Sequence, residues 1–308
     1  MMKWRLSDLP EPPPGRTGWP WTAEREPPAK DPCGDGWPRI SVITPSLNQA
    51  AYLEETIRSV LLQSYPNFEY VIIDAGSTDG SLDIIRKYSR FIDRWVSEKD
   101  RGQSDAINKG ARMASGEFLG WLNSDDALFP GALRAMGRAF RENAGADVIY
   151  GAGAKINAHG ETTKEIGFRA FDARRIGRQF FILQPSMFFR RDSFLRVGGL
   201  TLDSHYAMDW ELILKLMPFA RIVAIPDKIG KLRDYPATKT RTGGWPRMRE
   251  IAGIGRKFHG RTDRNYLIFA VKERIARITK RRQLRALTDR TLVALFGYHG
   301  YMIHEWPA

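Results

Sequence analysis

The stretch Phe118-Leu119-Gly120-Trp121-Leu122-Asn123-Ser124-Asp125-Asp126 decides how the rest of this chain is interpreted. Its first five residues have the length and the apolar composition of a buried β-strand, and the strand stops at two adjacent carboxylates. Paired acids at a strand end repel each other, which favours a metal ion or another cation beside them. Alternatively, Asp125 and Asp126 cap the helix expected to begin near Gly131 and favour its N-terminal dipole. This segment alone supports the two interpretations equally.

The composition indicates a globular protein with an anionic partner. At 308 residues with 43% hydrophobic content, the chain can bury one large or two medium domains. No apolar run approaches the roughly 20 residues that span a bilayer, and the N-terminus lacks a signal-peptide core, so we expect a cytoplasmic protein. The single cysteine, Cys33, excludes an internal disulfide and a multi-cysteine zinc site. The net charge of +13 favours nucleic acid, a membrane surface or a phosphorylated substrate as partner.

The first 38 residues are rich in proline and tryptophan. Nine prolines in this region disfavour helices and strand ladders, so we expect an extended arm. Trp4, Trp19, Trp21 and Trp37 predict that the arm lies on the folded body, because their apolar area is costly to leave in water. We therefore expect three parts: an arm at 1–38, an α/β domain at 39–240 and a basic helical tail at 241–308.

From Arg39 onward the sequence alternates between strand and helix patterns. Apolar runs predict strands at 40–44, 70–73, 94–96, 118–122 and 146–150, and helical spacing predicts helices at 52–63, 81–88 and 104–113. This alternation implies a mostly parallel sheet with helices on both faces and a ligand site beyond the carboxyl ends of the strands. We expect the first strand to break at Pro45, and we expect an edge strand at 222–226 because of Pro226.

Acidic residues follow several of these strands. Asp74 begins a glycine-containing turn after the second strand, and Asp100 begins the loop after the third. Asp209 lies near the start of a helix that runs through Leu216. Each acid also has a purely structural interpretation, as a helix cap or a surface acid that favours a helix dipole. If the strand ends converge, the acids line one crevice.

The C-terminal part concentrates positive charge. Between Arg256 and Arg290 there are twelve Lys or Arg and three acidic residues, with apolar residues at helical spacing on the opposite face. This segment is either a solvated helical face or a surface that binds an anionic membrane, which would place the protein on the inner face of the cell membrane. Nucleic acid is disfavoured as a partner, because no nucleic-acid-binding motif is present.

Several motifs in a fixed order resemble the family 2 glycosyltransferases with the GT-A fold, over residues 39 to about 235. They are Ser41-Val42-Ile43-Thr44-Pro45-Ser46-Leu47-Asn48, Ile73-Asp74-Ala75-Gly76-Ser77-Thr78-Asp79-Gly80, Asp100-Arg101-Gly102 through Ala106-Ile107-Asn108-Lys109-Gly110, Asn123-Ser124-Asp125-Asp126, Gln184-Pro185-Ser186 and Met208-Asp209. The resemblance implies an inverting transferase that moves a sugar from a nucleotide-diphosphate sugar to a hydroxyl acceptor. It further implies a saccharide or lipid-linked saccharide acceptor, in the assembly of a cell-surface polysaccharide or glycolipid.

The resemblance also implies a role for individual residues. It places Pro45, Asp74, Asp100, Asn123 and Asp126 on the nucleotide sugar, Gln184 on the acceptor side, Asp125 on Mg²⁺ or Mn²⁺, and Asp209 as the general base. Three positions depart from the family pattern: Asn123 replaces the first acid of the Asp-x-Asp motif, Ala75 replaces a second acid after Asp74, and Leu47 stands where many members have an aromatic residue. Arg233 and Lys239 lie where a basic segment of the family could reach the diphosphate.

Two other functions are consistent with strand-end acids. A nucleotidyltransferase also binds metal at such a site, but it would need a glycine-rich, lysine-bearing loop after the first strand, and residues 45–52 contain none. A non-catalytic membrane or nucleic-acid scaffold on a degenerate domain is the second alternative. It is disfavoured because candidates for both a metal ligand and a base are present.

Overall fold

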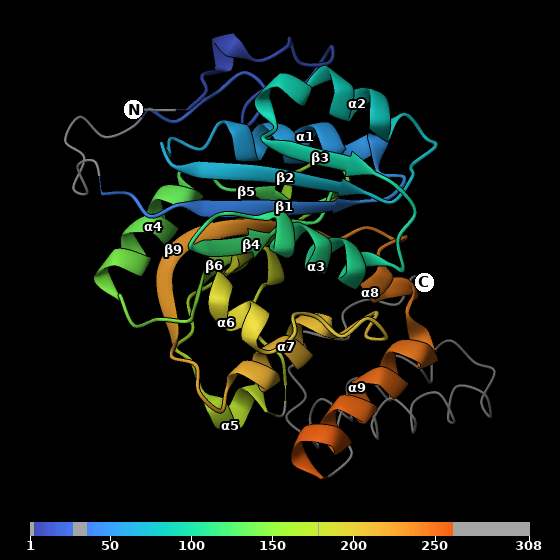
Figure 1. Ribbon diagram of the computed structural model, residues 1–308. Coiled ribbons are helices and arrows are strands. Elements are labelled where there is room, and N and C mark those ends of the chain that lie inside the picture. Colours follow the sequence, from blue (N-terminus) through green and yellow to red (C-terminus); the bar gives the residue numbers. More distant parts are fainter. Residues whose placement is uncertain (1–2, 27–35, 178, 261–308) are drawn as a thin grey trace.

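A nine-stranded sheet organises the described residues, which are 3–26, 36–177 and 179–260 in this computed structural model. The strand order is β3-β2-β1-β4-β8-β6-β9-β5, and β7 pairs with β6 outside this path (Figure 1). The strands are β1 (Ile40–Ser46), β2 (Phe68–Asp74), β3 (Arg94–Ser97), β4 (Phe118–Trp121), β5 (Ala127–Leu128), β6 (Val148–Ile156), β7 (Thr162–Ile166), β8 (Met187–Arg190) and β9 (Ile222–Arg233).

The sheet changes character at β8. The strands β3, β2, β1 and β4 are parallel, as the alternation of strands and helices predicts. All residues of β1 and β2 are buried, because helices cover both faces of this half. β8 pairs antiparallel with β4 and with β6, whereas β9 runs parallel to β6. The second half of the sheet is therefore mixed, which the sequence did not reveal.

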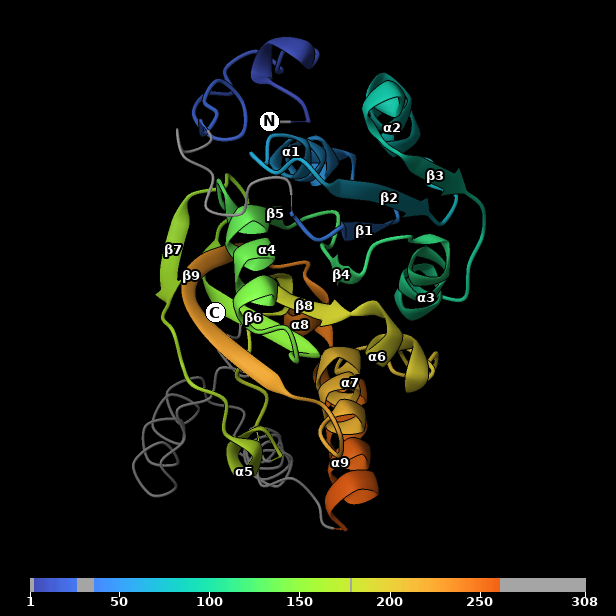
Figure 2. The same cartoon turned by 60° about the vertical axis from the view of Figure 1, so that its left-hand side comes forward.

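Helices pack on both faces of the sheet, as predicted. They are α1 (Ala50–Leu61), α2 (Ser81–Lys87), α3 (Gln103–Met113), α4 (Ala132–Glu142), α5 (Ala173–Ile176), α6 (Arg191–Arg196), α7 (Met208–Leu216), α8 (Lys239–Thr242) and α9 (Gly244–His259). Short 3₁₀ turns span Leu6–Asp8, Ser89–Phe91 and Gln184–Ser186. The apolar residues of α1, α2 and α4 share one core, and those of α3, α6, α7 and α9 share the other (Figures 1 and 2).

The two prolines that were expected to limit strands are both accommodated within them. β1 continues through Pro45 to Ser46, because the pairing of β1 with β4 has already ended at Ile43 and no ladder bond is needed there. Pro226 lies where the register between β6 and β9 shifts. The ladder hydrogen bonds are interrupted at that point, so the missing N–H of the proline is not needed. Among the described strands, the predicted edge strand at 222–226 pairs with β6 alone, whereas β9 continues to Arg233 and also pairs with β5 at Gly230 and Lys231.

The N-terminal arm lies on the body, as its tryptophans predict. Trp21 is 6% exposed, and the indole nitrogen of Trp19 donates a 2.9 Å hydrogen bond to the Leu128 carbonyl. The side chain of Arg58 in α1 is fully buried beneath the arm. Its guanidinium donates hydrogen bonds of 2.7–3.0 Å to the carbonyl oxygens of Pro10, Pro20 and Trp21. The arm's prolines prevent it from forming regular backbone hydrogen bonds, and the buried guanidinium of Arg58 supplies donors to its carbonyl oxygens instead.

The end of the described chain packs on the domain. In α9, Met248, Ile251 and Ile254 are buried in the same core as the apolar residues of α7, and the two helices lie side by side in both views (Figures 1 and 2). Residues 261–308 of the predicted basic tail lie outside the described residues, so membrane binding through 256–290 stays a prediction. Within the residues the structure does describe, no helix is both long and apolar enough to cross a membrane.

Replacing Arg58 by methionine should release the arm. Three buried carbonyls would lose their donor, and we expect the free energy of unfolding to fall by about 2–4 kcal/mol. Urea denaturation measures this loss, and limited proteolysis should show new cleavage between residues 10 and 22. Arg90→Met is the matched control, because Arg90 contacts the arm at an exposed site, the Asp8 carbonyl at 2.9 Å. Equal effects of the two substitutions would contradict the role of Arg58.

Candidate active site

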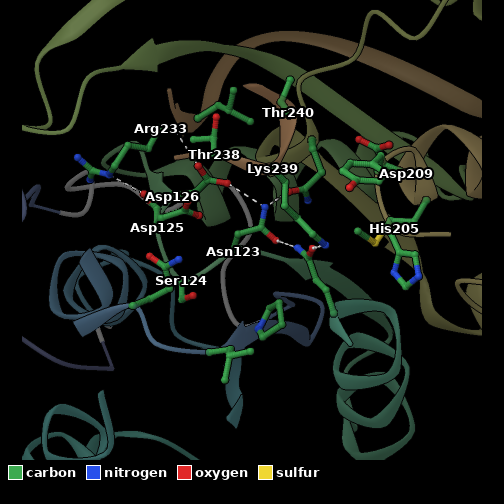
Figure 3. Close-up of a pocket in the computed structure, with 18 of the residues that line it drawn as sticks. Asn123, Ser124, Asp125, Asp126, His205, Asp209, Arg233, Thr238, Lys239 and Thr240 are labelled. Atoms are coloured by element: carbon green, nitrogen blue, oxygen red, sulfur yellow. Dashed lines mark hydrogen bonds between the residues drawn. The ribbon is translucent and has the colours of Figure 1, made fainter. Parts of the chain in front are cut away.

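A cavity of about 550 Å³ opens at the carboxyl ends of β1, β2, β3 and β4. Seven of the eight predicted site residues line it: Pro45, Asp100, Asn123, Asp125, Asp126, Gln184 and Asp209. Its far wall comes from the segment that follows β9, from Tyr235 through α8 to Met248 in α9. Asp125 and Asp126 lie on one side and Asp209 on the other, with Asn123 and Lys239 between them (Figure 3).

Asp74 is the predicted site residue that does not line the cavity. Its carboxylate is fully buried and accepts hydrogen bonds from the backbone nitrogens of Gly76 and Ser77 at 3.0 and 2.9 Å. The hydroxyls of Ser77 and Ser97 also donate to it, at 2.5 and 2.7 Å. Asp74 therefore holds the turn after β2 in shape, and the neighbouring Ala75 is the residue that reaches the cavity. A contact between Asp74 and the nucleotide stays a prediction.

Asn123 is the centre of a hydrogen-bonded chain across the cavity floor. Its amide nitrogen donates to Asp126 Oδ2 at 3.1 Å and to Gln184 Oε1 at 3.0 Å, and its oxygen accepts from Gln103 Nε2 at 2.7 Å. Lys239 Nζ completes the chain by donating to Gln103 Oε1 at 2.9 Å (Figure 3). A carboxylate in place of Asn123 could not donate to Asp126 and Gln184. The amide at this position thus ties the acid turn to Gln184, whose acceptor-side role stays a prediction.

Asp126 is held by β9. Its side chain is 2% exposed, and its Oδ1 accepts a 2.8 Å hydrogen bond from the backbone nitrogen of Arg233. The Arg233 side chain turns back to donate to the Asp125 carbonyl at 2.6 Å and forms a 2.8 Å ion pair with Glu55. Burial, followed by the negative charge of Asp125, holds the pKa of Asp126 well above the usual carboxyl range. Arg233 is therefore occupied within the protein and is not free to reach a diphosphate.

Asp125 is the more accessible acid of the pair. It is partly exposed to the cavity, and Tyr235 Oη donates to its Oδ2 at 3.2 Å. Burial raises the pKa of Asp125 by more than the Tyr235 hydrogen bond and the charge of Arg233 lower it, so its ionised form is only partly compensated. The alternative that the two acids cap the next helix is wrong. α4 begins after Gly131 with no side-chain cap, and β5 lies between the acids and that helix.

The acid pair suits a divalent ion that is shared with a substrate. Among the described residues no cluster of three or more His, Cys, Asp or Glu could hold a metal unaided. Mg²⁺ commonly binds one or two carboxylates and completes its coordination with substrate phosphates and water. Asp125, with its raised pKa and its open side toward the cavity, fits that role, whereas both Asp126 oxygens already accept hydrogen bonds from the protein.

Asp209 faces the cavity from the first turn of α7. Its Oδ1 accepts a 2.8 Å hydrogen bond from the Trp210 backbone nitrogen. Burial raises the pKa of Asp209 to about 6, while the positive charge of Arg247 lowers it and the negative charge of Glu250 raises it further. A carboxyl with this pKa is mostly ionised at neutral pH and is a stronger base than an ordinary carboxylate, which suits the acceptance of a proton.

Several cavity residues were not predicted from the sequence. Gln103 and Tyr235 bond to the predicted residues Asn123 and Asp125, and Arg247 approaches Asp209. Ser46 and Thr238 also line the cavity, and the hydroxyl of each is buried without a hydrogen-bond partner among the described residues. Tyr235 and Arg247 carry no local signal, because only the fold brings their segments to the strand ends.

These observations define an α/β protein whose cavity joins a turn with two buried acids to a carboxyl suited to proton transfer. A family model described as glycosyl transferase family 2 matches residues 41–198, just over half of the chain. The chain therefore belongs to glycosyltransferase family 2, whose members invert the configuration at the anomeric carbon. The predicted family and function class are confirmed.

Individual relatives agree with this assignment. The chain is 31% identical over 185 residues to a PGL/p-HBAD biosynthesis glycosyltransferase of Mycobacterium bovis, which covers 58% of this chain and 69% of that relative. It is 42% identical over 92 residues to the putative teichuronic acid biosynthesis glycosyltransferase TuaG of Bacillus subtilis, which covers 29% of this chain and 36% of that relative.

Solved structures confirm the GT-A fold. S. aureus TarS 1-349 in complex with UDP-GlcNAc matches with a TM-score of 0.56 at 21% identity, over 70% of this chain and 65% of that one. The mannosyltransferase PcManGT from Pyrobaculum calidifontis, in complex with GDP-Man and Mn²⁺, matches with a TM-score of 0.56 at 21% identity, over 89% and 85%. At this level of identity the comparison supports the fold and does not indicate the substrate.

Asp125→Asn should not destabilise the metal-free protein at pH 7. Because the pKa of Asp125 is raised on folding, its ionisation opposes folding as the pH rises above the ordinary carboxyl range, and the substitution removes that penalty. Urea denaturation in EDTA should give an equal or larger free energy of unfolding than for the wild type.

Asp234→Asn is the matched control on the same cavity wall. Although burial raises the pKa of Asp234, hydrogen bonds from Arg241 and Lys155 outweigh it and lower that pKa, so its ionised form stabilises the fold. We expect this variant to lose about 1–2 kcal/mol of stability. A loss as large in Asp125→Asn would contradict the raised pKa of Asp125.

Proposed function

We propose that the protein transfers a sugar from a nucleotide-diphosphate sugar to a hydroxyl of a saccharide or lipid-linked saccharide, with a divalent ion, in the assembly of a cell-surface polysaccharide or glycolipid. The observation that carries the proposal is the pairing, across one cavity, of a partly exposed acid with a raised pKa and a carboxyl whose pKa is about 6. The printed names of the relatives, which refer to PGL/p-HBAD and teichuronic acid biosynthesis, support the kind of product.

The donor lies on the Asp125 side in this proposal. Pro45 and Asp100 border the space for the base and ribose, and Ser46 offers an unpartnered hydroxyl there. Asp125 holds Mg²⁺ or Mn²⁺, and the binding of GDP-Man and Mn²⁺ by the fold relative PcManGT supports this assignment. When bound, the ion neutralises the charge that develops on the leaving diphosphate. Asp126 and Asn123 fix the turn that presents Asp125.

The acceptor lies on the Asp209 side. Asp209 accepts the proton of the acceptor hydroxyl while that oxygen forms a bond to the anomeric carbon and the bond to the diphosphate oxygen breaks on the opposite face. This displacement inverts the anomeric configuration. Gln184, which donates a 2.9 Å hydrogen bond to the Trp121 carbonyl, sits on the floor between the two sides. A second function class is not favoured by any cavity residue.

Donor binding should depend on Asp125 and on a divalent ion. We expect one nucleotide-diphosphate sugar in a panel to raise the melting temperature in the presence of Mn²⁺, because ligand that binds only the native state stabilises it. Asp125→Asn should abolish the Mn²⁺-dependent part of that shift, and Asp234→Asn should retain it. A shift that persists unchanged in Asp125→Asn would remove Asp125 from the metal site.

Transfer should depend on the ionised form of Asp209. Since its pKa is raised to about 6, kcat/KM should fall about tenfold per pH unit below pH 6, where the carboxyl is protonated and cannot act as a base. Asp209→Asn should reduce transfer at least about 10³-fold with donor binding intact. Asp203→Asn is the control, because Asp203 is an exposed acid outside the cavity lining. Turnover by Asp209→Asn near the wild-type rate would refute the assigned base.

A further inference from the structure

Glu250 of α9 binds the loop that immediately precedes Asp209. Its Oε1 accepts hydrogen bonds from the backbone nitrogens of Tyr206 and Ala207 at 2.8 and 2.7 Å, and from the Ser204 hydroxyl at 3.0 Å. Its Oε2 accepts from the backbone nitrogen of His205 at 2.9 Å. One carboxylate thus holds four consecutive residues next to the proposed base.

These contacts supply what the sequence of α7 lacks. A helix usually begins with a residue whose side chain accepts a hydrogen bond from the first turn. The residue at that position in α7 is Ala207, which has no such side chain. Because Asp209 is the second residue of the helix, any freedom at this start moves its carboxylate. Glu250 fixes the start from a neighbouring helix that packs on α7 in the same core.

We propose that Glu250 is a positioning residue that fixes the Asp209 carboxylate and the acceptor-side wall for transfer. The inference depends on the proposed function, in which Asp209 is the base. His205 and Tyr206, which Glu250 holds, both line the cavity, and His205 lies on the same side of it as Asp209 (Figure 3). Ser104, in the first turn of α3, donates to the Ser204 carbonyl at 3.1 Å, so the same loop is also joined to the donor side.

Glutamate offers two acceptor oxygens to the loop and a negative charge beside Asp209, whereas glutamine offers one acceptor oxygen and no charge. The carbonyl oxygen of a glutamine can accept from Tyr206 and Ala207, but its amide group would face the N–H of His205, where two donors oppose each other. The glutamate also carries negative charge beside Asp209. The other charged or titratable groups near this position are Arg247, one turn earlier on α9, Lys239 of α8, and His205 of the loop. Arg247 acts on Asp209 in the opposite sense to Glu250.

The test compares Glu250→Ala and Glu250→Gln in the full chain with Glu211→Gln as the control. Glu211 is a buried acid of α7 whose carboxylate pairs with Lys257 of α9 at 2.7 Å and, among the described residues, makes no hydrogen bond to the loop 204–207. We expect Glu250→Ala to lower kcat about 10- to 100-fold while the dissociation constant of the donor stays unchanged, because misplacement of a reacting group acts on the chemical step. Glu250→Gln should be intermediate, and Glu211→Gln should retain the wild-type kcat.

A second measurement does not need turnover. The Asp209 carboxyl, labelled with ¹³C and assigned by its absence in Asp209→Asn, is titrated by NMR in the wild type, Glu250→Gln and Glu211→Gln. Removal of the Glu250 charge should lower the pKa of Asp209 and move the acid limb of kcat/KM to lower pH, while Glu211→Gln leaves both in place. A wild-type kcat in Glu250→Ala, an equal loss in Glu211→Gln, or an unmoved pKa of Asp209 in Glu250→Gln overturns the inference. Retained turnover in Asp209→Asn instead refutes the proposed function, so the two failures are distinct.

Discussion

The buried guanidinium of Arg233 is the interaction on which the cavity depends. It lies at the end of β9 and bonds the Asp125 carbonyl and the Asn157 and Ala158 carbonyls, with a 2.8 Å ion pair to Glu55 of α1. Two adjacent acids in a buried turn would otherwise face only desolvation and mutual repulsion. Arg233 offsets part of that cost and fixes the backbone of the turn, but it leaves the Asp125 carboxylate open toward the cavity. The residual negative charge is therefore available for a cation that arrives with a substrate.

The acidic residues of the cavity fall into two groups, according to whether nearby cations neutralise them. Asp234 is neutralised within the protein by Lys155 and Arg241, and its pKa is lowered on balance. Asp125 and Asp209 keep raised pKa values, because burial is not matched by nearby cations. Raised pKa values at cavity-facing acids oppose folding at neutral pH, which is typical of groups kept for binding or catalysis. The pKa of Asp126 is raised as well, but both of its oxygens accept hydrogen bonds within the protein. Asp125 and Asp209 combine a raised pKa with a side open to the cavity, and they are the two acids to which the proposal assigns chemistry.

Local sequence was sufficient for the first half of the fold and for most of the site. The strand–helix alternation from Arg39 predicted β1 to β4, and the acids at strand ends predicted a shared crevice, because parallel strands place their ends on one edge. The sequence could not reveal that the Asp74 carboxylate is occupied by hydrogen bonds within the protein, since these come from the folded positions of Ser77 and Ser97. It also did not show that the strand at 222–226 continues past Pro226, because a register shift that spares a ladder bond has no local signature.

The two sides of the cavity differ in how they are built. The proposed donor side consists of turns directly after β1, β3 and β4, within the region that the family model matches, and the turn after β4 is also fixed by Arg233 of β9. Apart from Gln184, the proposed acceptor side lies after residue 198 and is assembled from α7, the segment after β9, and α9, which meet only in the folded protein. Its geometry is set by contacts that are distant in sequence, such as Glu250 with Ala207 and Ser104 with Ser204. A substitution in α9 can therefore alter the acceptor side while the donor turns keep their shape, which separates the two halves of the reaction physically.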